Sequence, residues 1–269
     1  MSKKILIAAA GLFLGLQSFS ASAGNINAAQ AAVDKQDYET ALKALAPLVK
    51  DGDSNATNLM GQMYENGWGV EKDTDKAKSL YDQGARRGHL ASVNSLRKLK
   101  NIDYKIELDA LLPKVAAGDA EAQNRAGEMY EFGYGTDRNP QEAFRLFQLA
   151  AEQGSVNAQH NLGRCYNFGT GTKQDFVEAE RWYRIASEKG HTESMFFLGT
   201  LYSNGYGQDT SHASDIIAYA WMHNAAALGN PTASAIESRL LMKLQENQMD
   251  EAKTLASSYE AEYVKPFKN

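Results

Sequence analysis

The feature that most constrains this chain is an internal repeat. Four segments share alanine, glycine and aromatic residues at fixed offsets, and their central glycines are Gly61, Gly127, Gly163 and Gly199. The last three of these glycines lie 36 residues apart. A period of roughly 20 to 50 residues indicates a solenoid or array, in which stacked copies bury faces that one copy cannot bury alone. The four segments are Asn55–Gly88, Glu121–Gly154, Asn157–Gly190 and Glu193–Gly229.

Each copy predicts two helices. In the first copy, apolar residues spaced three and four apart run from Ala56 to Tyr64, which is the pattern of one buried helix face. Gly61 lies close to this face, so we expect it to let the partner helix approach. Gly67 and Gly69 follow, and glycines at such positions suit a left-handed helix end and a reversal of the chain.

The second helix of each copy has a start signal. Asn139 is followed by Pro140, a residue suited to the first helical position, and by Glu142 three residues on. Asp175 and Glu178 repeat this spacing in the third copy. Both pairs have the form of a capping box, in which the two side chains satisfy backbone donors reciprocally.

The third copy carries a fuller signature, A-x-x-x-L-G-x-x-Y-x-x-G-x-G followed after a gap by A-x-x-x-Y and a final glycine. Its positions are Ala158, Leu162, Gly163, Tyr166, Gly169, Gly171, Ala179, Tyr183 and Gly190. The pattern resembles the Sel-one-like repeat family, whose members are relatives of tetratricopeptide arrays. The resemblance implies an all-α fold, a right-handed α-solenoid (superhelix) of two-helix repeats with helical caps, that scaffolds or docks other proteins.

Four parts are expected along the chain. They are a signal peptide at 1–23, an N-terminal helical pair at 24–54, the repeats at 55–229 and C-terminal capping helices at 230–269. Gly61 and Gly127 are separated by 66 residues rather than 36, which predicts a shortened fifth copy with a nearly deleted loop at about 90–118. The helices expected after Gly229 carry more charge, as the end of a solenoid requires.

The first residues predict export. Lys3 and Lys4 precede an apolar stretch at 5–16, and Ala21, Ser22 and Ala23 follow it. A basic start, a short apolar segment and a small-x-small ending are typical of a secretory signal peptide, here cleaved between Ala23 and Gly24. A membrane anchor is disfavoured because about 20 apolar residues are needed to span a bilayer. We therefore expect a periplasmic protein, or a secreted one, with no membrane insertion after cleavage.

Charge and cysteine content argue against other partners and against disulfides. Without Lys3 and Lys4, the chain has 33 acidic and 26 basic side chains. This balance argues against nucleic acid as a partner, because nucleic acid is bound through clustered Lys and Arg. Cys165 is the single cysteine, so no internal disulfide is expected despite export.

No pattern in the chain predicts catalysis, a metal or a cofactor. The histidines form no H-E-x-x-H pattern. Cys165 lies five residues after His160, and nucleophilic cysteines work with a nearby histidine. However, Met63, Met129 and Leu201 occupy the matching slot in the other copies, which favours a buried apolar position for Cys165.

Two further catalytic interpretations are weaker. Glu128 and Glu131 are three residues apart and share a helix face, but a solvated face is favoured over acid–base chemistry. Cysteine-rich members of the resembled family, for which a β-lactamase-like activity has been proposed, carry cysteine pairs that this chain lacks. The chain also lacks the K-T-G motif of such enzymes. We therefore expect a protein that is not an enzyme.

The predicted partner-binding site is the face of each first helix opposite its apolar face. In tetratricopeptide arrays, relatives of the resembled family, the first helices line the concave surface, so these residues should line one groove. They vary between copies more than the buried positions do, which favours binding; the alternative is that free surface varies without function. The predicted groove residues are Asn58, Gln62, Glu65, Asn124, Glu128, Glu131, His160, Arg164, Asn167, Phe196, Thr200 and Ser203.

The loop aromatics Trp68, Tyr134 and Tyr206 are the next candidate surface. Three functions remain open at this point. The leading one is a periplasmic protein–protein interaction scaffold that holds a partner protein in the groove. The second is an immunity protein that neutralises a periplasm-acting toxin such as a secreted phospholipase effector, a role that exported members of the resembled family have. The third, a hydrolase, is disfavoured.

The cleavage prediction can be checked directly. The mature protein should begin at Gly24 and be found in the periplasmic fraction of a Gram-negative cell, because Ala21-Ser22-Ala23 is a suitable cleavage site. The measurement is N-terminal sequencing of the soluble protein. Recovery of Met1 at its N-terminus would contradict the prediction.

Overall fold

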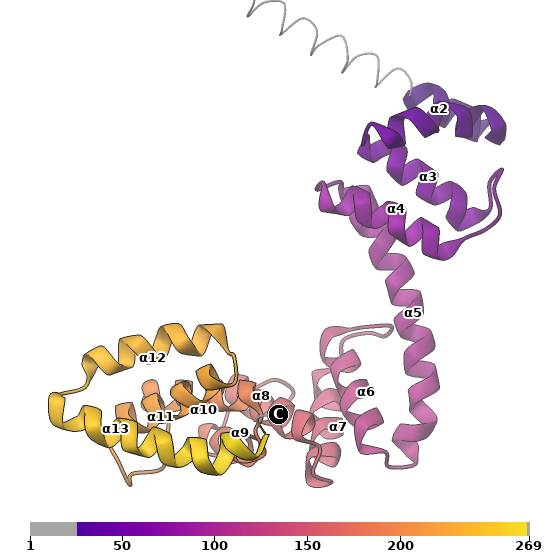
Figure 1. Ribbon diagram of the computed structural model, residues 1–269. Coiled ribbons are helices and arrows are strands. Elements are labelled where there is room, and N and C mark those ends of the chain that lie inside the picture. Colours follow the sequence, from indigo (N-terminus) through magenta and orange to yellow (C-terminus); the bar gives the residue numbers. More distant parts are fainter. Residues whose placement is uncertain (1–25, 268–269) are drawn as a thin grey trace, which may run out of the picture. The chain divides into compact units, whose positions relative to one another are not determined.

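The structure is a computed structural model that describes residues 26–267, and every regular element in that range is a helix (Figure 1). The predicted signal peptide and its cleavage site lie outside these residues. The chain divides into two compact units, one ending at Asp103 and one beginning at Tyr104. Within the described range, no helix is both long and apolar enough to span a bilayer.

The first unit contains the predicted N-terminal helical pair and the first copy of the repeat. A helix at 26–34 and α2 (Tyr38–Lys50) form the pair, and α3 (Ser54–Asn66) and α4 (Thr74–Arg86) form the copy. Ala29, Leu45 and Met63 come from three of these helices and are fully buried in one core. The apolar stripe predicted for the first helix is therefore the face that α3 turns to its neighbours.

The second unit contains the other three copies as helix pairs. They are α6 (Ala120–Phe132) with α7 (Pro140–Glu152), α8 (Val156–Phe168) with α9 (Phe176–Ser187), and α10 (Thr192–Ser203) with α11 (Ser214–Ala227). Two helices follow, α12 (Pro231–Lys243) and α13 (Glu246–Tyr259), and both contact α11. The largest core lies at this end, where Trp221 of α11 packs against Tyr259 and Tyr263.

A glycine on each first helix sets its distance from the second helix. A Cβ atom placed on Gly61 would lie 2.5 Å from Tyr81 Cε1, and one on Gly127 would lie 2.6 Å from Phe147 Cε1. Both distances are shorter than real Cβ contacts, so only glycine leaves room for the ring. The prediction that Gly61 admits the partner helix is confirmed.

The helix ends largely follow the predicted signals. Gly67 adopts the left-handed conformation at the end of α3, and Pro140 is the first residue of α7. The Asn139 side chain accepts a hydrogen bond from the Glu142 backbone N–H at 3.1 Å. The reciprocal half of the predicted capping box is absent, because the Glu142 carboxylate binds Arg145 instead. The predicted box is therefore a one-sided cap.

The stretch predicted to be a shortened copy folds differently. Residues 90–116 form one continuous helix, α5 (Leu90–Ala116), rather than a pair. The stretch between Leu90 and Ala116 has no glycine, so nothing equivalent to Gly67 and Gly69 stops the helix. The boundary between the two compact units falls within this helix, at Asp103.

Gly127→Ala tests the helix-to-helix contact. The added methyl group would overlap the Phe147 ring, and overpacking of this kind costs about 1–3 kcal/mol, partly offset by the higher helix propensity of alanine. We expect the free energy of unfolding to fall by about 1–2 kcal/mol in urea denaturation followed by circular dichroism. Gln148→Ala, on the exposed face of α7, is the control and should change it by less than about 0.5 kcal/mol. A Gly127→Ala variant as stable as the wild type would show that the two helices can move apart freely.

Candidate interaction surface

The predicted groove residues lie on the first helices as expected, but they are not a free surface. Asn58, Asn124, Glu131 and Asn167 are buried. The remaining eight are half-buried, and none is fully exposed. The expectation of solvated side chains is therefore wrong for the four buried residues, and alanine substitutions there would change stability as well as any binding.

These side chains are buried because they join one copy to the next. In the second unit, Asn161 of α8 donates a hydrogen bond to Asn124 of α6 at 3.0 Å. Arg164 of α8 forms an ion pair with Glu131 of α6 at 2.9 Å. Both contacts bridge consecutive first helices. Polar residues on this face therefore act first as connections between copies.

Glu131 depends strongly on its one guanidinium partner. Its side chain is only 7% exposed, and Arg164 binds Oε1 while Oε2 has no hydrogen-bond partner among the described residues. Removing one member of a buried ion pair leaves an uncompensated charge and is strongly destabilising. Glu128, the other member of the proposed carboxylate pair, is bound by Arg125 at 3.1 Å. Each carboxylate is thus held by an arginine from the protein itself, as expected for structural ion pairs.

In both units, a serine hydroxyl accepts or shares hydrogen bonds where one copy meets the next. We call this contact the joint. In the first unit, Asn58 donates to the Ser92 hydroxyl at 3.2 Å, and His89 Nδ1 lies 2.9 Å from the same oxygen. In the second unit, the Ser194 hydroxyl lies 3.0 Å from Nδ1 of both His160 and His191. His160 therefore takes the place that Asn58 takes in the first copy.

The second of these joints is sensitive to protonation. Burial, with smaller effects from the charges of His191 and Arg164, lowers the pKa of His160 to about 3. Burial also lowers the pKa of His191. His191 uses Nδ1 to accept from the Ser194 backbone N–H at 3.2 Å, which caps α10. Both imidazoles are thus held neutral in the folded protein.

The loop aromatics, predicted as an alternative surface, pack instead on an earlier helix. Trp68 stacks on Tyr38 with ring centroids 6.1 Å apart, and Tyr134 stacks on Tyr104 at 4.8 Å. Tyr206 stacks on Phe176 at 4.0 Å. These rings therefore help to hold each loop against the layer before it, although Tyr134 and Tyr206 are still partly exposed to solvent.

Two exposed aromatics that the sequence analysis missed are Phe132 and Phe168. They are the last residues of α6 and α8, 50% and 59% exposed. The Arg164 guanidinium lies 6.0 Å from the Phe132 ring, and Phe168 meets Phe197 edge-on at 6.1 Å. The sequence did carry a signal for them at the position just before the first loop glycine. The residues at this position in the four copies are Asn66, Phe132, Phe168 and Asn204, so two copies have a phenylalanine where the other two have an asparagine.

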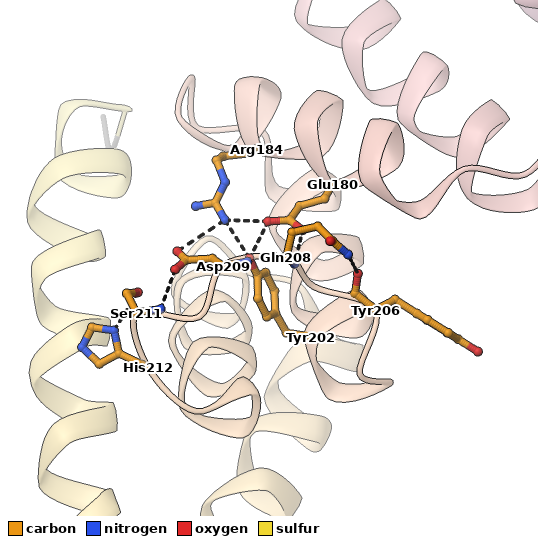
Figure 2. Close-up of polar contacts among 8 residues, drawn as sticks. All are labelled: Glu180, Arg184, Tyr202, Tyr206, Gln208, Asp209, Ser211 and His212. Atoms are coloured by element: carbon orange, nitrogen blue, oxygen red, sulfur yellow. Dashed lines mark hydrogen bonds and ion pairs between the residues drawn. The ribbon is translucent and has the colours of Figure 1, made fainter.

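The densest polar cluster surrounds Glu180 and Arg184 of α9 (Figure 2). Arg184 binds Glu180 at 2.9 Å and the Tyr202 hydroxyl at 2.9 Å, and Tyr202 also donates to Glu180. The Gln208 backbone N–H donates to the second Glu180 oxygen at 2.6 Å, and Asp209 lies 3.7 Å from Arg184. Tyr206 points away from the ion pairs (Figure 2).

This cluster holds the loop of the fourth copy and offers no free acid or base. Both oxygens of Glu180 are bound by groups of the protein itself. Burial raises the pKa of Tyr202, with further contributions from its bond to Glu180, so the hydroxyl stays protonated. Within the described residues, no group of three His, Cys, Asp or Glu side chains is placed to hold a metal ion.

A comparison with known families decides the identity of the fold. The family model described as "Sel1 repeat" matches residues 54–89, 120–155, 156–191 and 192–230. The chain belongs to the Sel1 repeat family. The matched ranges coincide with the four helix pairs α3–α4, α6–α7, α8–α9 and α10–α11 and leave α5 unmatched. A comparison with curated proteins found no match.

Among the solved structures that match, one shows the same repeat fold. A protective antigen of uropathogenic Escherichia coli with an SLR fold is 25% identical, with a TM-score of 0.55 over 90% of this chain and 54% of that one. The present chain thus spans about half the length of that antigen. A Sel1 repeat protein from Oxalobacter formigenes is 24% identical, with a TM-score of 0.45 over 87% of this chain and 96% of that one. An immunity protein of Pseudomonas aeruginosa is 18% identical, with a TM-score of 0.31 over 92% of this chain and 88% of that one. The predicted all-α solenoid is confirmed by the E. coli antigen and the repeat match.

Cys165 of this Sel1 repeat protein is expected to be unreactive. Its side chain is 1% exposed, and burial, reinforced by the charge of Glu131, raises the pKa of the thiol to about 12. Because the thiolate is the reactive form, a disulfide reagent should label the native protein on the order of a hundredfold or more slowly than the denatured protein. Equal labelling rates at pH 8 would mean that the thiol is accessible in the native fold.

His160→Asn tests the joint at Ser194. The pKa of His160 is lower folded than unfolded, so the unfolded state binds the proton more tightly and wild-type stability falls as the pH drops below about 6.5. The loss from this residue is up to about 1.4 kcal/mol per pH unit. Asparagine, the residue of the equivalent joint, should preserve the fold and reduce this loss between pH 7 and pH 5, as measured by urea denaturation. Identical pH profiles would show that His160 is not held neutral.

Proposed function

We propose that this Sel1 repeat protein is an exported, non-enzymatic scaffold that binds a partner protein in the periplasm. Its docking site is a surface at the ends of α6 and α8, here called the aromatic face and made of Phe132, Arg164, Phe168 and Phe197. The Lys3-Lys4 start, the apolar stretch and the Ala21-Ser22-Ala23 ending support export.

The observation that carries the site is the exposure of two phenylalanines at the same repeat position. Half or more of each ring is exposed to solvent, and burial of that apolar surface by a partner protein would be favourable. Aromatic residues and arginine are enriched at the centres of protein–protein interfaces. Arg164 lies over the Phe132 ring, and Glu131 holds it in place from the buried side.

The surrounding chemistry favours binding over catalysis. The candidate nucleophile Cys165 is buried, and the candidate acids Glu128 and Glu131 are held by arginines. Of the predicted groove residues, only Arg164 is included in the proposed docking site. Arg164 is the groove residue that belongs to the aromatic face, while Glu131 orients it.

The double variant Phe132→Ala with Phe168→Ala tests this site. Both side chains are at least half exposed, so the thermal midpoint should change little, whereas loss of two aromatic anchors should weaken a partner by about a hundredfold or more. Proteins captured from a periplasmic extract by the wild type and by the variant are compared by quantitative mass spectrometry. A protein that the wild type captures and the variant does not is then purified, and its affinity for each of the two is measured by calorimetry.

Leu149→Ala with Val177→Ala is the matched control, because these exposed residues lie on the second helices of the same two copies. The control should retain the partner. A partner retained equally by all three proteins would overturn the aromatic face as the docking site. The identity of the partner separates the two functions predicted from the sequence, because a captured secreted toxin would indicate the immunity role.

A further inference from the structure

The first half of α5 begins like the first helix of a copy but has no second helix to pack on. His89 and His191 each accept a hydrogen bond from the backbone N–H three residues on, at 3.3 and 3.2 Å, so α5 and α10 begin alike. In all four copies the residue eight positions after the N-cap is glycine, whereas in α5 the residue eight positions after His89 is Arg97. Glycine at that position lets the second helix approach, and the long side chain of arginine would block it.

The side of α5 that would meet a second helix is exposed instead. Leu90, Val93, Arg97 and Lys100 are spaced three, four and three residues apart, which places them on one helix face. Leu90 is 76% exposed and Val93 is 39% exposed, and both cations are exposed as well. Met195, which has the position of Val93 in the fourth copy, is fully buried. We call these four residues of α5 the open face.

The open face lies in a basic stretch of an acidic chain. Residues 83–102 belong to the first unit and contain no Asp or Glu, but five basic residues, namely Arg86, Arg87, Arg97, Lys98 and Lys100. Arg86 and Lys98 are paired with carboxylates outside the stretch, at 2.7 and 3.3 Å. Arg97 donates to Asn94 at 3.0 Å, and neither it nor Lys100 forms an ion pair among the described residues. The open face thus combines apolar side chains with two cations that the protein does not neutralise.

An anionic phospholipid surface matches this combination. Aliphatic side chains can reach the boundary between headgroups and acyl chains while Arg and Lys stay at the lipid phosphates. The acidic residues elsewhere on the chain oppose this contact little, because charges more than about 8 Å from the bilayer are screened at physiological salt. We propose that the open face of α5 binds peripherally to a bilayer that contains an anionic phospholipid such as phosphatidylglycerol. Such a contact needs no spanning helix, and it goes beyond the scaffold role because it uses a different surface.

An acidic segment of another protein is the alternative, and the cations of the open face fit it less well. A carboxylate is best selected by a guanidinium held in one orientation, as Glu131 holds Arg164 of the aromatic face. Arg97 is bound by one uncharged side chain, that of Asn94, and Lys100 by none among the described residues. The open face also has no aromatic residue, the type at which protein interfaces are commonly centred. A bilayer attracts basic residues through its surface potential, which requires no fixed geometry.

The test is sedimentation of the full mature protein with lipid vesicles at about 0.1 M salt. Vesicles of phosphatidylethanolamine with phosphatidylglycerol should bind the protein, and neutral phosphatidylcholine vesicles should not. Arg97→Gln with Lys100→Gln should lower the partition coefficient about tenfold or more, because each basic residue near an anionic bilayer contributes about fivefold. Leu90→Ala should lower it about threefold through the loss of apolar contact.

Two variants serve as controls. Lys173→Gln with Lys253→Gln removes the same charge from exposed positions of the third copy and of α13, so it should bind the vesicles like the wild type. Arg97→Lys should also bind normally, because the bilayer responds to the charge and not to the shape of the guanidinium. Circular dichroism confirms that each variant is folded.

Several outcomes would overturn the proposal. They are failure to bind phosphatidylglycerol vesicles, equal binding of phosphatidylcholine vesicles, and a loss in the Lys173→Gln, Lys253→Gln control as large as in the open-face variant. Binding of a polyglutamate peptide without binding of vesicles would assign the open face to an acidic protein segment. The Phe132→Ala, Phe168→Ala variant should bind vesicles normally, so failure of the open face and failure of the aromatic face give different results.

Discussion

The close contact between a first-helix glycine and the ring of its second helix determines how every copy is built. Tyr81, Phe147 and Tyr183 each lie where the Cβ atom of Gly61, Gly127 or Gly163 would be. The two helices can therefore approach closely enough to bury the alanine-rich faces between them. In the fourth copy Met222 takes the place of the ring, and a Cβ atom placed on Gly199 would lie 3.0 Å from its flexible side chain. A tightly fixed helix pair then presents the same outer faces to its neighbours in each copy.

Because the pairs are packed alike in successive copies, polar residues on the first helices meet the next copy at equivalent places. Asn58, Asn124 and His160 occupy one such place, and each is hydrogen-bonded to a residue of a following first helix or of α5. A side chain used in this way is only partly available to a partner. Beyond these joints, at the ends of α6 and α8, Phe132 and Phe168 are exposed.

The repeat register, the helix pairs and the approach of Gly61 were predictable because they follow from periodicity within one copy. Two features were not. A helical wheel of α6 alone places Glu131 opposite the apolar face, yet Arg164 from the next copy buries it. The continuity of α5 was also missed, because the 66-residue spacing suggested a shortened helix pair where no glycine was present to end the first helix. The first error comes from treating a copy in isolation, and the second from extending the repeat to a segment without its glycines.

Contacts between copies also explain part of the sequence variation that was taken as a sign of partner binding. His160 with Ser194 replaces a joint that is Asn58 with Ser92 in the first copy, so the residues change while the hydrogen bond persists. Variation on this face therefore follows in part from the partner across the joint and is not by itself a sign of binding. Solvent exposure distinguishes residues that contact the next copy from residues that are free to contact another protein. Phe132 and Phe168 have the same position in their copies as Asn66 and Asn204, and half or more of each ring is exposed to solvent. Within the chain, Phe132 stacks on Tyr134 and Phe168 meets Phe197 edge-on, and the proposed partner would cover the exposed part of each ring.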